Sequence, residues 1–423
     1  MNKKLTMIDL FAGAGGLSEG FIRAGFKPVA HVEMDPAACN TLRTRAAYYW
    51  LKENRQLPIY YKYLRREITR SELYASVPDA VLDSVIKAPI GAETNRGIFK
   101  NVQALAGNRS LDLLVGGPPC QAYSLMGRST DPNRMQGDER NYLFKYYIEY
   151  LEKFEPKYFV FENVTGLISA KDKNGEKYLD KIKAAFRHAG YQIALETLIA
   201  SDFGVPQHRK RVIIVGRKGM DIPTFPKLKR SKHAETITQL FEDLPKLKAS
   251  EEKNLYVSSS DKHLKSLNKL GLRSKKTSAP LTYHVARPNI ERDLQIYEIA
   301  ANGWINERRR IQYNELPVEL QTHKNIHSFS DRFKVVAGDE NASHTVVAHI
   351  AKDGHYYIHP DPEQNRSISV REAARLQTFP DDFFFEGMSE KLSRTAAFKQ
   401  IGNAVPVLLA QRIADALLKQ WDD

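Results

Sequence analysis

The sequence contains little cysteine, with only Cys39 and Cys120 among its 423 residues. Two cysteines cannot form a disulfide framework, and their spacing offers no paired thiols for zinc, so we expect a reducing, intracellular setting and no metal site. Long apolar runs are also lacking, since no stretch of about 18 or more apolar residues occurs. Membrane and secretory proteins are therefore unexpected classes, and the predicted location is the cytoplasm.

Basic residues, in contrast, are abundant. The chain has 63 Lys and Arg against 50 Asp and Glu, which gives a formal net charge of +13. An excess of this size favours a polyanionic partner, with nucleic acid as the leading candidate. The length is sufficient for a large core and two domains.

Short runs rich in branched apolar residues alternate with amphipathic helical patterns along much of the chain. Helical patterns occur at 141–154 and 177–190, and the apolar runs lie at 5–10, 29–33, 111–117, 158–164 and 211–216. Such alternation predicts an α/β fold with a mostly parallel sheet wrapped by helices.

Two segments interrupt this alternation. Residues 36–100 are rich in Tyr, Arg and Lys and are far longer than a connecting loop, so we expect a helical appendage there. Residues 218–345 carry basic clusters mixed with aromatic residues and predict a separate basic domain. The predicted division is a catalytic domain at 1–217, the basic domain at 218–345, and a segment at 346–423 that completes the first.

The stretch "DLFAGAGG" (9–16) follows the first predicted strand and opens a helix. Its glycines allow the backbone to approach a ligand at the helix N-terminus. Glu33 closes the second strand 20 residues after Gly13, where a carboxylate can accept hydrogen bonds from both hydroxyls of a ribose. This pattern predicts a nucleoside cofactor, but a tight turn without a ligand, or a nicotinamide oxidoreductase, would also explain it.

Cys120 lies in "VGGPPCQAYS" (115–124), behind Pro118 and Pro119. A free cysteine is most often a small buried apolar residue. Here, however, it follows the carboxyl end of a predicted parallel strand, where open α/β sheets bind ligands, and the two prolines fix the backbone before it. The polar, glycine-containing residues that follow are typical of a loop that covers a site. We therefore interpret Cys120 as a nucleophile.

Charged side chains follow at the ends of two later predicted strands. Glu162 ends one strand, and Arg209 and Arg211 lie two apart at the start of the next, so that both should point to one face. A solvent-exposed helix cap and a basic strand end without a ligand are the alternatives. The functional interpretation is a general acid and a cationic group that share one cleft with Cys120.

Seven motifs, taken in their order, resemble those of the cytosine-5 DNA methyltransferases, the prokaryotic restriction-modification type. They are "DLFAGAGGLS" (9–18), "VEMD" (32–35), "GGPPCQAYS" (116–124), "ENV" (162–164), "QHRKR" (207–211), "RSISVREAARLQTFPDDF" (366–383) and "QIGNAVPV" (400–407). The resemblance implies a Rossmann-like S-adenosylmethionine-dependent fold and methyl transfer to carbon 5 of a cytosine that is flipped out of duplex DNA. It further implies a monomeric enzyme, and a cognate restriction endonuclease is compatible with it.

The resemblance also implies roles for individual residues. Cys120 would be the nucleophile, with Glu162 and either Arg209 or Arg211 holding the base. Other substrate contacts would be Pro119, Gln121, Ser124, Asn163 and Gln207. Cofactor contacts would be Phe11, Ala12, Gly13, Gly15, Gly16, Glu33, Met34, Pro118, Asn403 and Val405. Residues 218–345 would form the target-recognition domain.

The sequence departs from the family pattern in two places. Met34 stands where many members carry an aromatic residue that stacks on adenine, and no acidic residue is assigned near 96–105. Arg366 and Arg371 are expected to be braces or phosphate contacts, and 400–407 should fold back beside the first motif, with the helix 407–420 on the sheet. A tRNA methyltransferase and a non-catalytic nucleic-acid-binding protein remain alternatives.

Overall fold

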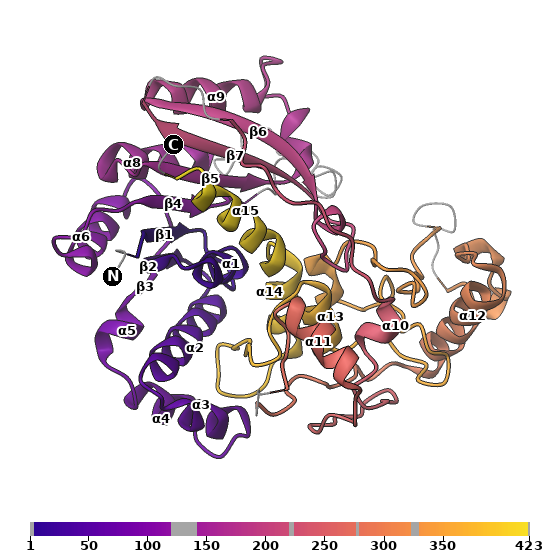
Figure 1. Cartoon of the computed structure of the whole chain (residues 1–423). Helices are drawn as coiled ribbons and strands as arrows, with labels where there is room; N and C mark the ends of the chain where they lie inside the picture. The colour runs from indigo at the N-terminus through magenta and orange to yellow at the C-terminus, as the bar shows by residue number, and fades with distance from the viewer. Residues whose placement is uncertain (1–3, 120–141, 220–223, 276–278, 323–329, 422–423) are drawn as a thin grey trace.

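A seven-stranded sheet forms the centre of the larger lobe in the computed structural model, which describes residues 4–119, 142–219, 224–275, 279–322 and 330–421 (Figure 1). The strand order is β3-β2-β1-β4-β5-β7-β6. Neighbouring strands from β3 to β5 are parallel, and β7 is antiparallel to both β5 and β6. The bounds are β1 Thr6–Leu10, β2 Lys27–Glu33, β3 Val85–Lys87, β4 Leu113–Gly116, β5 Tyr158–Asn163, β6 Tyr191–Ile199 and β7 Lys210–Lys218. The predicted α/β fold with a mostly parallel sheet is confirmed.

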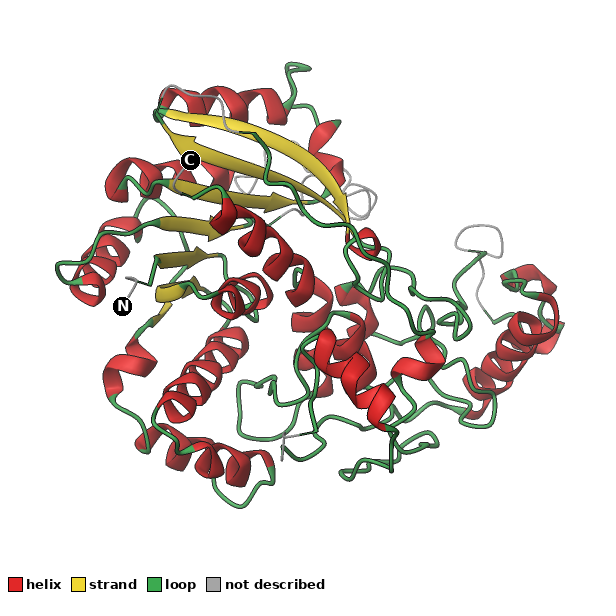
Figure 2. Cartoon of the chain, in the orientation of Figure 1, coloured by secondary structure: helices red, strands yellow, loops and turns green. Residues whose placement is uncertain are grey.

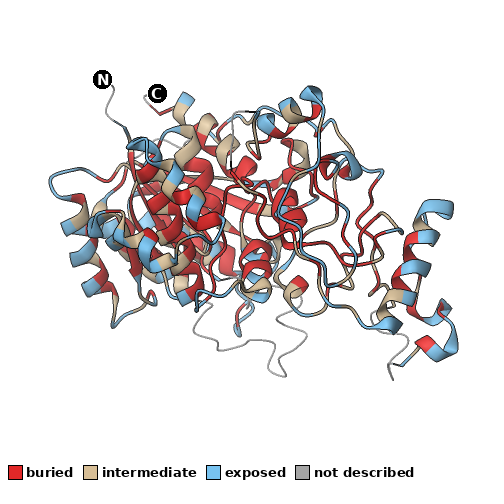
Figure 3. Ribbon diagram, turned by 90° about the horizontal axis from the view of Figure 1, so that it is seen from below, coloured by how far each residue is buried: buried red, intermediate tan, exposed pale blue. Residues whose placement is uncertain are grey.

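Helices cover both faces of this sheet (Figure 2). Alternate residues of the strands enter two separate apolar clusters, so Met7 of β1 packs with one face and Ile8 with the other. The first cluster includes residues of α1 (Gly16–Ala24), α2 (Pro36–Glu53) and α15 (Val407–Lys419). The second includes residues of α6 (Asn95–Ala106), α8 (Leu143–Phe154) and α9 (Tyr178–His188). Figure 3 shows the buried residues concentrated along the sheet and these helices.

The C-terminal helix packs on the sheet beside α1, as predicted. A Cβ placed on Gly20 of α1 would lie 2.5 Å from the Ala410 Cβ of α15, so this glycine permits the close approach of the two helices. The segment Arg394–Lys419, which contains α14 (Arg394–Asn403) and α15, has the length and apolar composition of a membrane span. Because 72% of its most apolar part is buried inside the protein, it is a pair of core helices here.

The segment 36–100 differs from the expected helical appendage. It is mainly helical, with α2, α3 (Leu57–Leu64), α4 (Arg70–Ala75), α5 (Asp79–Asp83) and the start of α6. It also supplies β3, however, the edge strand that pairs with β2. Its residues Tyr60 and Leu73 are buried in the same cluster as α1 and α15. The segment is therefore an integral part of the larger lobe, and the expectation of a separate helical appendage is wrong.

Residues 218–345 contain α10 (Ile237–Leu240), α11 (Asp261–Lys269) and α12 (Glu291–Glu307), joined by long loops on the right of Figure 1. Leu240, Leu267 and Tyr283 belong to the cluster of α1 and α15. Residues of α12 instead form a small core of their own with the region around Tyr313 and Phe333. The division at residues 217 and 345 remains a prediction.

Short 3-10 helices occur in both parts of the protein, at Thr165–Ile168, Ala200–Asp202, Tyr313–Glu315, Val318–Leu320 and Ala348–Ala351.

Three buried arginines lie in α13 (Val370–Leu376) or just before it and connect this helix to residues 218–345. Arg371 donates to the carbonyl and hydroxyl of Thr282. Arg375 donates to Asp243 and to Asp381, at 2.5 and 2.6 Å. Arg366 pairs with Glu372. Because Arg366 and Arg371 are both fully buried, they are braces, and the alternative of a phosphate contact is wrong.

A further buried ion pair joins α1 to α2. The Glu19 carboxylate accepts from Arg45 Nη2 at 2.7 Å and Nε at 2.9 Å, and from the Tyr49 hydroxyl at 2.9 Å. Burial alone would raise the pKa of Glu19, but the Arg45 guanidinium, helped by Arg23 and Tyr49, lowers the pKa to about 2.

We predict that Glu19→Gln destabilises the protein. Because the folded-state pKa is about 2 against an ordinary 4.5, the pair stabilises the fold above about pH 4.5 and loses this effect as the pH falls towards 2. A shift of this size corresponds to about 3 kcal/mol. Urea unfolding at pH 7 and at pH 3 measures the loss, which should be larger at pH 7. The exposed pair of Glu67 with Arg65 provides a control, since Glu67→Gln should leave the unfolding midpoint unchanged.

Candidate active site

The loop between β1 and α1 is a turn with left-handed residues that directs the Gly13 N–H at the Glu33 carboxylate. Phe11, Gly13 and Gly15 have φ values of 54°, 55° and 82°. The Gly13 N–H donates to Glu33 Oε2 at 2.7 Å. The amides of Met34 and Asp35 donate to the other oxygen of Glu33, both at 2.8 Å. The carboxylate is therefore held at the carboxyl end of β2 by main-chain donors.

The turn leaves room for a ligand next to Gly13. A Cβ built on Gly13 would meet no atom within 4 Å, so the space at this glycine is open. Each carboxylate oxygen has two lone pairs, so Glu33 can accept from ribose hydroxyls in addition to the amides. Within the turn Ala12 is buried and Phe11 is half-buried, and Met34, which follows Glu33, is 64% exposed.

The C-terminal motif lies against this turn, as the sequence predicted. A Cβ on Gly16 would be 2.5 Å from the Val405 carbonyl oxygen and 3.0 Å from Ala404 Cβ, so only glycine permits this approach. Asn403 ends α14 and is exposed, whereas Val405 is buried. The motifs at the two ends of the sequence therefore lie in direct contact.

The ends of β4 and β5 bring the predicted catalytic segment to the same edge of the sheet. Asn163 is buried and donates from Nδ2 to the Pro118 carbonyl at 3.3 Å. A Cβ on Gly117 would lie 2.5 Å from Glu162 Oε2, so the Glu162 side chain lies over the main chain of Gly117. Pro118 is buried and Pro119 is exposed. The predicted site residues Cys120, Gln121 and Ser124 lie outside the described residues.

The two predicted arginines make different contacts. Arg211 Nε lies 2.6 Å from Glu162 Oε1, and the two side chains are only 13% and 15% exposed. Arg209 precedes β7, is 1% exposed, and donates to the carbonyls of Val346 at 2.7 Å and Gly402 at 3.1 Å. Among the described contacts, the expected convergence with Glu162 therefore holds for Arg211 and not for Arg209.

Gln207 is also buried, and both ends of its amide bind the main chain. Nε2 donates to the Leu376 carbonyl at 3.1 Å, and Oε1 accepts from the Val346 N–H at 2.9 Å. Gln207 and Arg209 thus connect the start of β7 to the C-terminal part of the chain. Sequence reasoning missed Val346 and Gly402 as their partners, and also missed the contact of Gly117 with Glu162. For Gly117 a signal was present, since a glycine pair precedes the prolines.

The structure combines a mixed sheet, a glycine turn that binds the Glu33 carboxylate, and the Glu162–Arg211 pair at one edge of the sheet. Together with the seven ordered motifs, these features are those of a nucleic-acid methyltransferase. The family model described as C-5 cytosine-specific DNA methylase matches residues 5–57 and 93–419. The chain therefore belongs to this family and is a DNA (cytosine-5-)-methyltransferase of the type II, restriction-modification kind.

Relatives cover almost the whole chain. It is 42% identical to the type II methyltransferase M.Bpa9945I of Bacillus paralicheniformis, over 98% of both chains. It is 32% identical to the type II methyltransferase M1.HphI of Haemophilus parahaemolyticus, over 98% of this chain and 87% of that one.

Solved structures share the fold. A prophage-encoded E. coli protein assigned as a DNA modification methyltransferase has a TM-score of 0.61 at 21% identity, over 99% of this chain and 100% of that one. The S. pombe Dnmt2 methyltransferase has a TM-score of 0.53 at 15% identity, over 99% and 100%.

We predict that lysine substitutions distinguish a structural role of Arg209 from a catalytic role of Arg211. Arg209→Lys keeps the charge but cannot donate to both carbonyls, so it should lower the free energy of unfolding by about 1–3 kcal/mol. Arg211→Lys should leave stability close to wild type and slow methylation, because lysine has no Nε group at this place to keep the close contact with Glu162. Thermal unfolding and single-turnover methylation measure the two effects. A stable, inactive Arg209→Lys protein would contradict this assignment.

Proposed function

We propose that the protein transfers a methyl group from S-adenosylmethionine to carbon 5 of a cytosine flipped out of double-stranded DNA, with Cys120 as the nucleophile. The observation that carries the proposal is the Glu162–Arg211 pair, which lies over the main chain of Gly117, three residues before Cys120. A base that occupies this edge of the sheet would meet an acidic and a cationic group together. A stacked base cannot reach such a site, so the target must leave the duplex.

The residue types suit this chemistry. Carbon 5 of cytosine is a weak nucleophile, and addition of the Cys120 thiolate to carbon 6 moves electron density onto carbon 5. The Glu162 carboxyl group, in its protonated form, would donate to ring nitrogen 3, and Arg211 would donate to the carbonyl oxygen, so that both stabilise the charge that develops on the ring. After the transfer a base removes the proton from carbon 5, and the thiol is eliminated.

The cofactor would supply an electrophilic methyl group on sulfur. Its nucleoside fits the open side of Gly13, where Glu33 can accept from the ribose hydroxyls. We propose Phe11, Gly15, Asn403 and Val405 as further contacts around the same pocket, with Met34 beside the adenine. A thioether packs on an aromatic ring less rigidly than an aromatic side chain does.

We propose residues 218–345, called the recognition region below, as the part that reads the DNA sequence. A stretch of this length favours duplex DNA over tRNA as the substrate. The Glu162–Arg211 pair also argues against a protein that only binds DNA. We further propose that the enzyme acts as a monomer on chromosomal DNA in the cytoplasm and protects it from a cognate restriction endonuclease.

We predict that DNA with 5-fluorocytosine at the target traps the enzyme, because fluorine cannot leave as a proton does. The adduct should map to Cys120. Burial, with the nearby Glu33 carboxylate, raises the pKa of the Cys39 thiol to about 12, so that thiol is protonated and unreactive. Peptide mapping by mass spectrometry should find the adduct in wild type and in Cys39→Ala, and none in Cys120→Ala. An adduct at any other residue would refute the mechanism.

We predict that an exposed arginine after α12 contacts phosphate. Among the described residues Arg310 forms no ion pair and lies over the Trp304 ring, whereas Arg309 is paired with Glu307 and Glu315. Arg310→Gln should therefore lower the slope of log Kd against log salt by about one. Arg309→Gln should change the slope less. The bisulfite pattern should be the same in both variants, since phosphate contacts carry no sequence information.

A further inference from the structure

Residues 58–92 lie outside the two parts of the chain that the family model matches. They contain most of α3, together with α4, α5 and β3, and the proposed chemistry uses none of them. Several of their side chains, however, contact one stretch of the C-terminal part, residues 381–389, which we call the bridging segment.

Main-chain carbonyls of the bridging segment are held by two side chains of this insertion. The Tyr60 hydroxyl donates to the Asp382 carbonyl at 2.8 Å. Arg70 donates from Nη1 to the Gly387 carbonyl at 3.1 Å and from Nη2 to the Met388 carbonyl at 3.2 Å. A stretch without secondary structure thus receives part of its main-chain hydrogen bonds from the insertion, while side chains of the family-matched chain, such as Gln400, supply others.

The Glu386 carboxylate is the centre of these contacts. It is 2% exposed, and its oxygens accept from the Tyr63 hydroxyl at 2.5 Å, from Thr44 Oγ1 at 2.6 Å and from Arg70 Nη1 at 3.3 Å. Burial raises the pKa of Glu386, although these three donors oppose that effect. Such a buried carboxylate is costly unless its donors remain in place, so its position depends on Tyr63 and Arg70.

On its other side the bridging segment contacts the recognition region. The Phe384 ring lies between Tyr63 of α3 and Tyr283 of the recognition region, with ring centroids 5.2 and 4.9 Å away. Tyr283 donates from its hydroxyl to the Phe385 carbonyl, and its own φ is 60°, a conformation that only firm contacts maintain. Arg66 adds a direct but exposed pair with Glu252.

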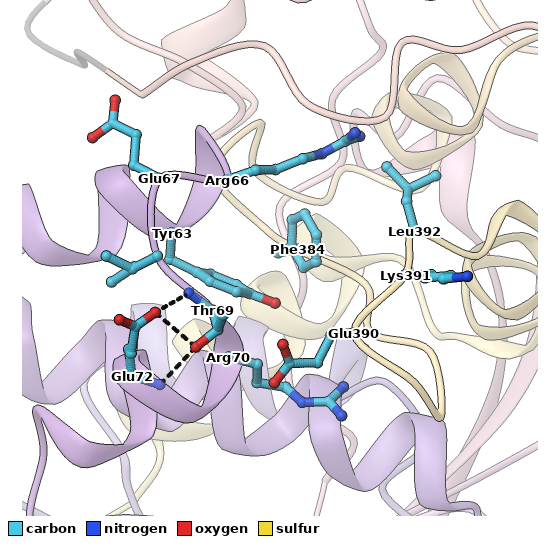
Figure 4. Close-up of a pocket in the computed structure, with 11 residues that line it drawn as sticks. Tyr63, Arg66, Glu67, Thr69, Arg70, Glu72, Phe384, Glu390, Lys391 and Leu392 are labelled. Carbon is cyan, nitrogen blue, oxygen red and sulfur yellow. Dashed lines mark hydrogen bonds between the residues drawn. The ribbon is translucent and has the colours of Figure 1, made fainter.

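A cavity of about 440 Å³ lies at this junction. Figure 4 shows Tyr63, Arg66 and Phe384 at its centre, with Lys391 and Leu392 at its edge. Its cationic side chains are matched by acidic ones, namely Glu67, Glu72 and Glu390. The cavity therefore favours no ligand of one charge. The cavity shows that apolar packing is incomplete here, so the polar contacts of Tyr63 and Arg70 contribute to holding the bridging segment in place.

We propose that residues 58–92 are a positioning element for target recognition. Tyr63 and Arg70 hold the bridging segment, and the bridging segment holds Tyr283 and with it the recognition region in the orientation that reads DNA. This inference rests on the proposed function. It concerns the DNA side of the reaction and leaves the cofactor side untouched.

The test compares Arg70→Ala, Arg70→Lys and Tyr63→Phe with wild type. The control is Arg65→Ala, since Arg65 lies in the same insertion and its ion pair among the described residues is with Glu67 on the surface. The readouts are KM for bisulfite-mapped target DNA, kcat at saturating DNA, methylation of sites that differ by one base pair, and calorimetric affinity for S-adenosylmethionine. Tyr63→Phe keeps the ring against Phe384, so it should fold.

We expect Arg70→Ala to raise KM for DNA roughly tenfold, the effect of about one lost charge-assisted hydrogen bond. Methylation of near-target sites should increase, while kcat and cofactor affinity stay within about twofold of wild type. Arg70→Lys should recover part of the loss, Tyr63→Phe should show a smaller change of the same kind, and Arg65→Ala should match wild type.

Unchanged KM and site preference in folded Arg70→Ala and Tyr63→Phe would overturn the proposal. So would a loss of kcat and cofactor affinity without a change in KM, because that pattern indicates a general structural role. Wild-type protein in the same assay separates this outcome from a failure of the proposed function. If wild type methylates cytosine and the variants behave like it, only the positioning role is refuted.

Discussion

The Arg375 guanidinium lies fully buried between two carboxylates that come from different parts of the chain, Asp243 of the recognition region and Asp381 after α13. Burial alone would raise the pKa of Asp243, but Arg375 and its neighbours hold it well below the ordinary range. Removing one partner from such a buried group typically costs about 3–5 kcal/mol. The orientation of the recognition region therefore depends on this cluster, and the contacts of Arg371 and Phe384 with the same region add to its effect.

The sheet explains why the candidate site is in one place. Parallel strands end at the same edge of a sheet. This edge therefore receives residues that are far apart in sequence: Glu33 at the end of β2, Pro118 after β4 and Glu162 near the end of β5. The reversed strand β7 then starts at this edge, because it is antiparallel to β5, and delivers Arg211 there. The strand order and directions alone therefore place the positions of Glu162 and Arg211 next to each other, whatever side chains they carry.

Local signals in the sequence predicted much of this arrangement. The five short apolar runs correctly predicted β1, β2, β4, β5 and β7. Gly13 and Glu33, which lie 20 residues apart, form a hydrogen bond in the structure. The strand β3 was missed because three residues carry no periodicity, and β6 because its middle is only half-buried. The partners of Arg209 lie 137 and 193 residues away, and such contacts leave no mark in local sequence.

The contact of Gly16 with the Val405 turn, and of α1 with α15, has a consequence for biosynthesis. A ribosome makes the glycine turn first and the Val405 turn almost a full chain later, and domains fold as their segments emerge. During translation α1 therefore has an apolar face that α15 has not yet covered. If the two turns hold the cofactor as proposed, the chain can begin to methylate DNA only after α15 has packed onto α1.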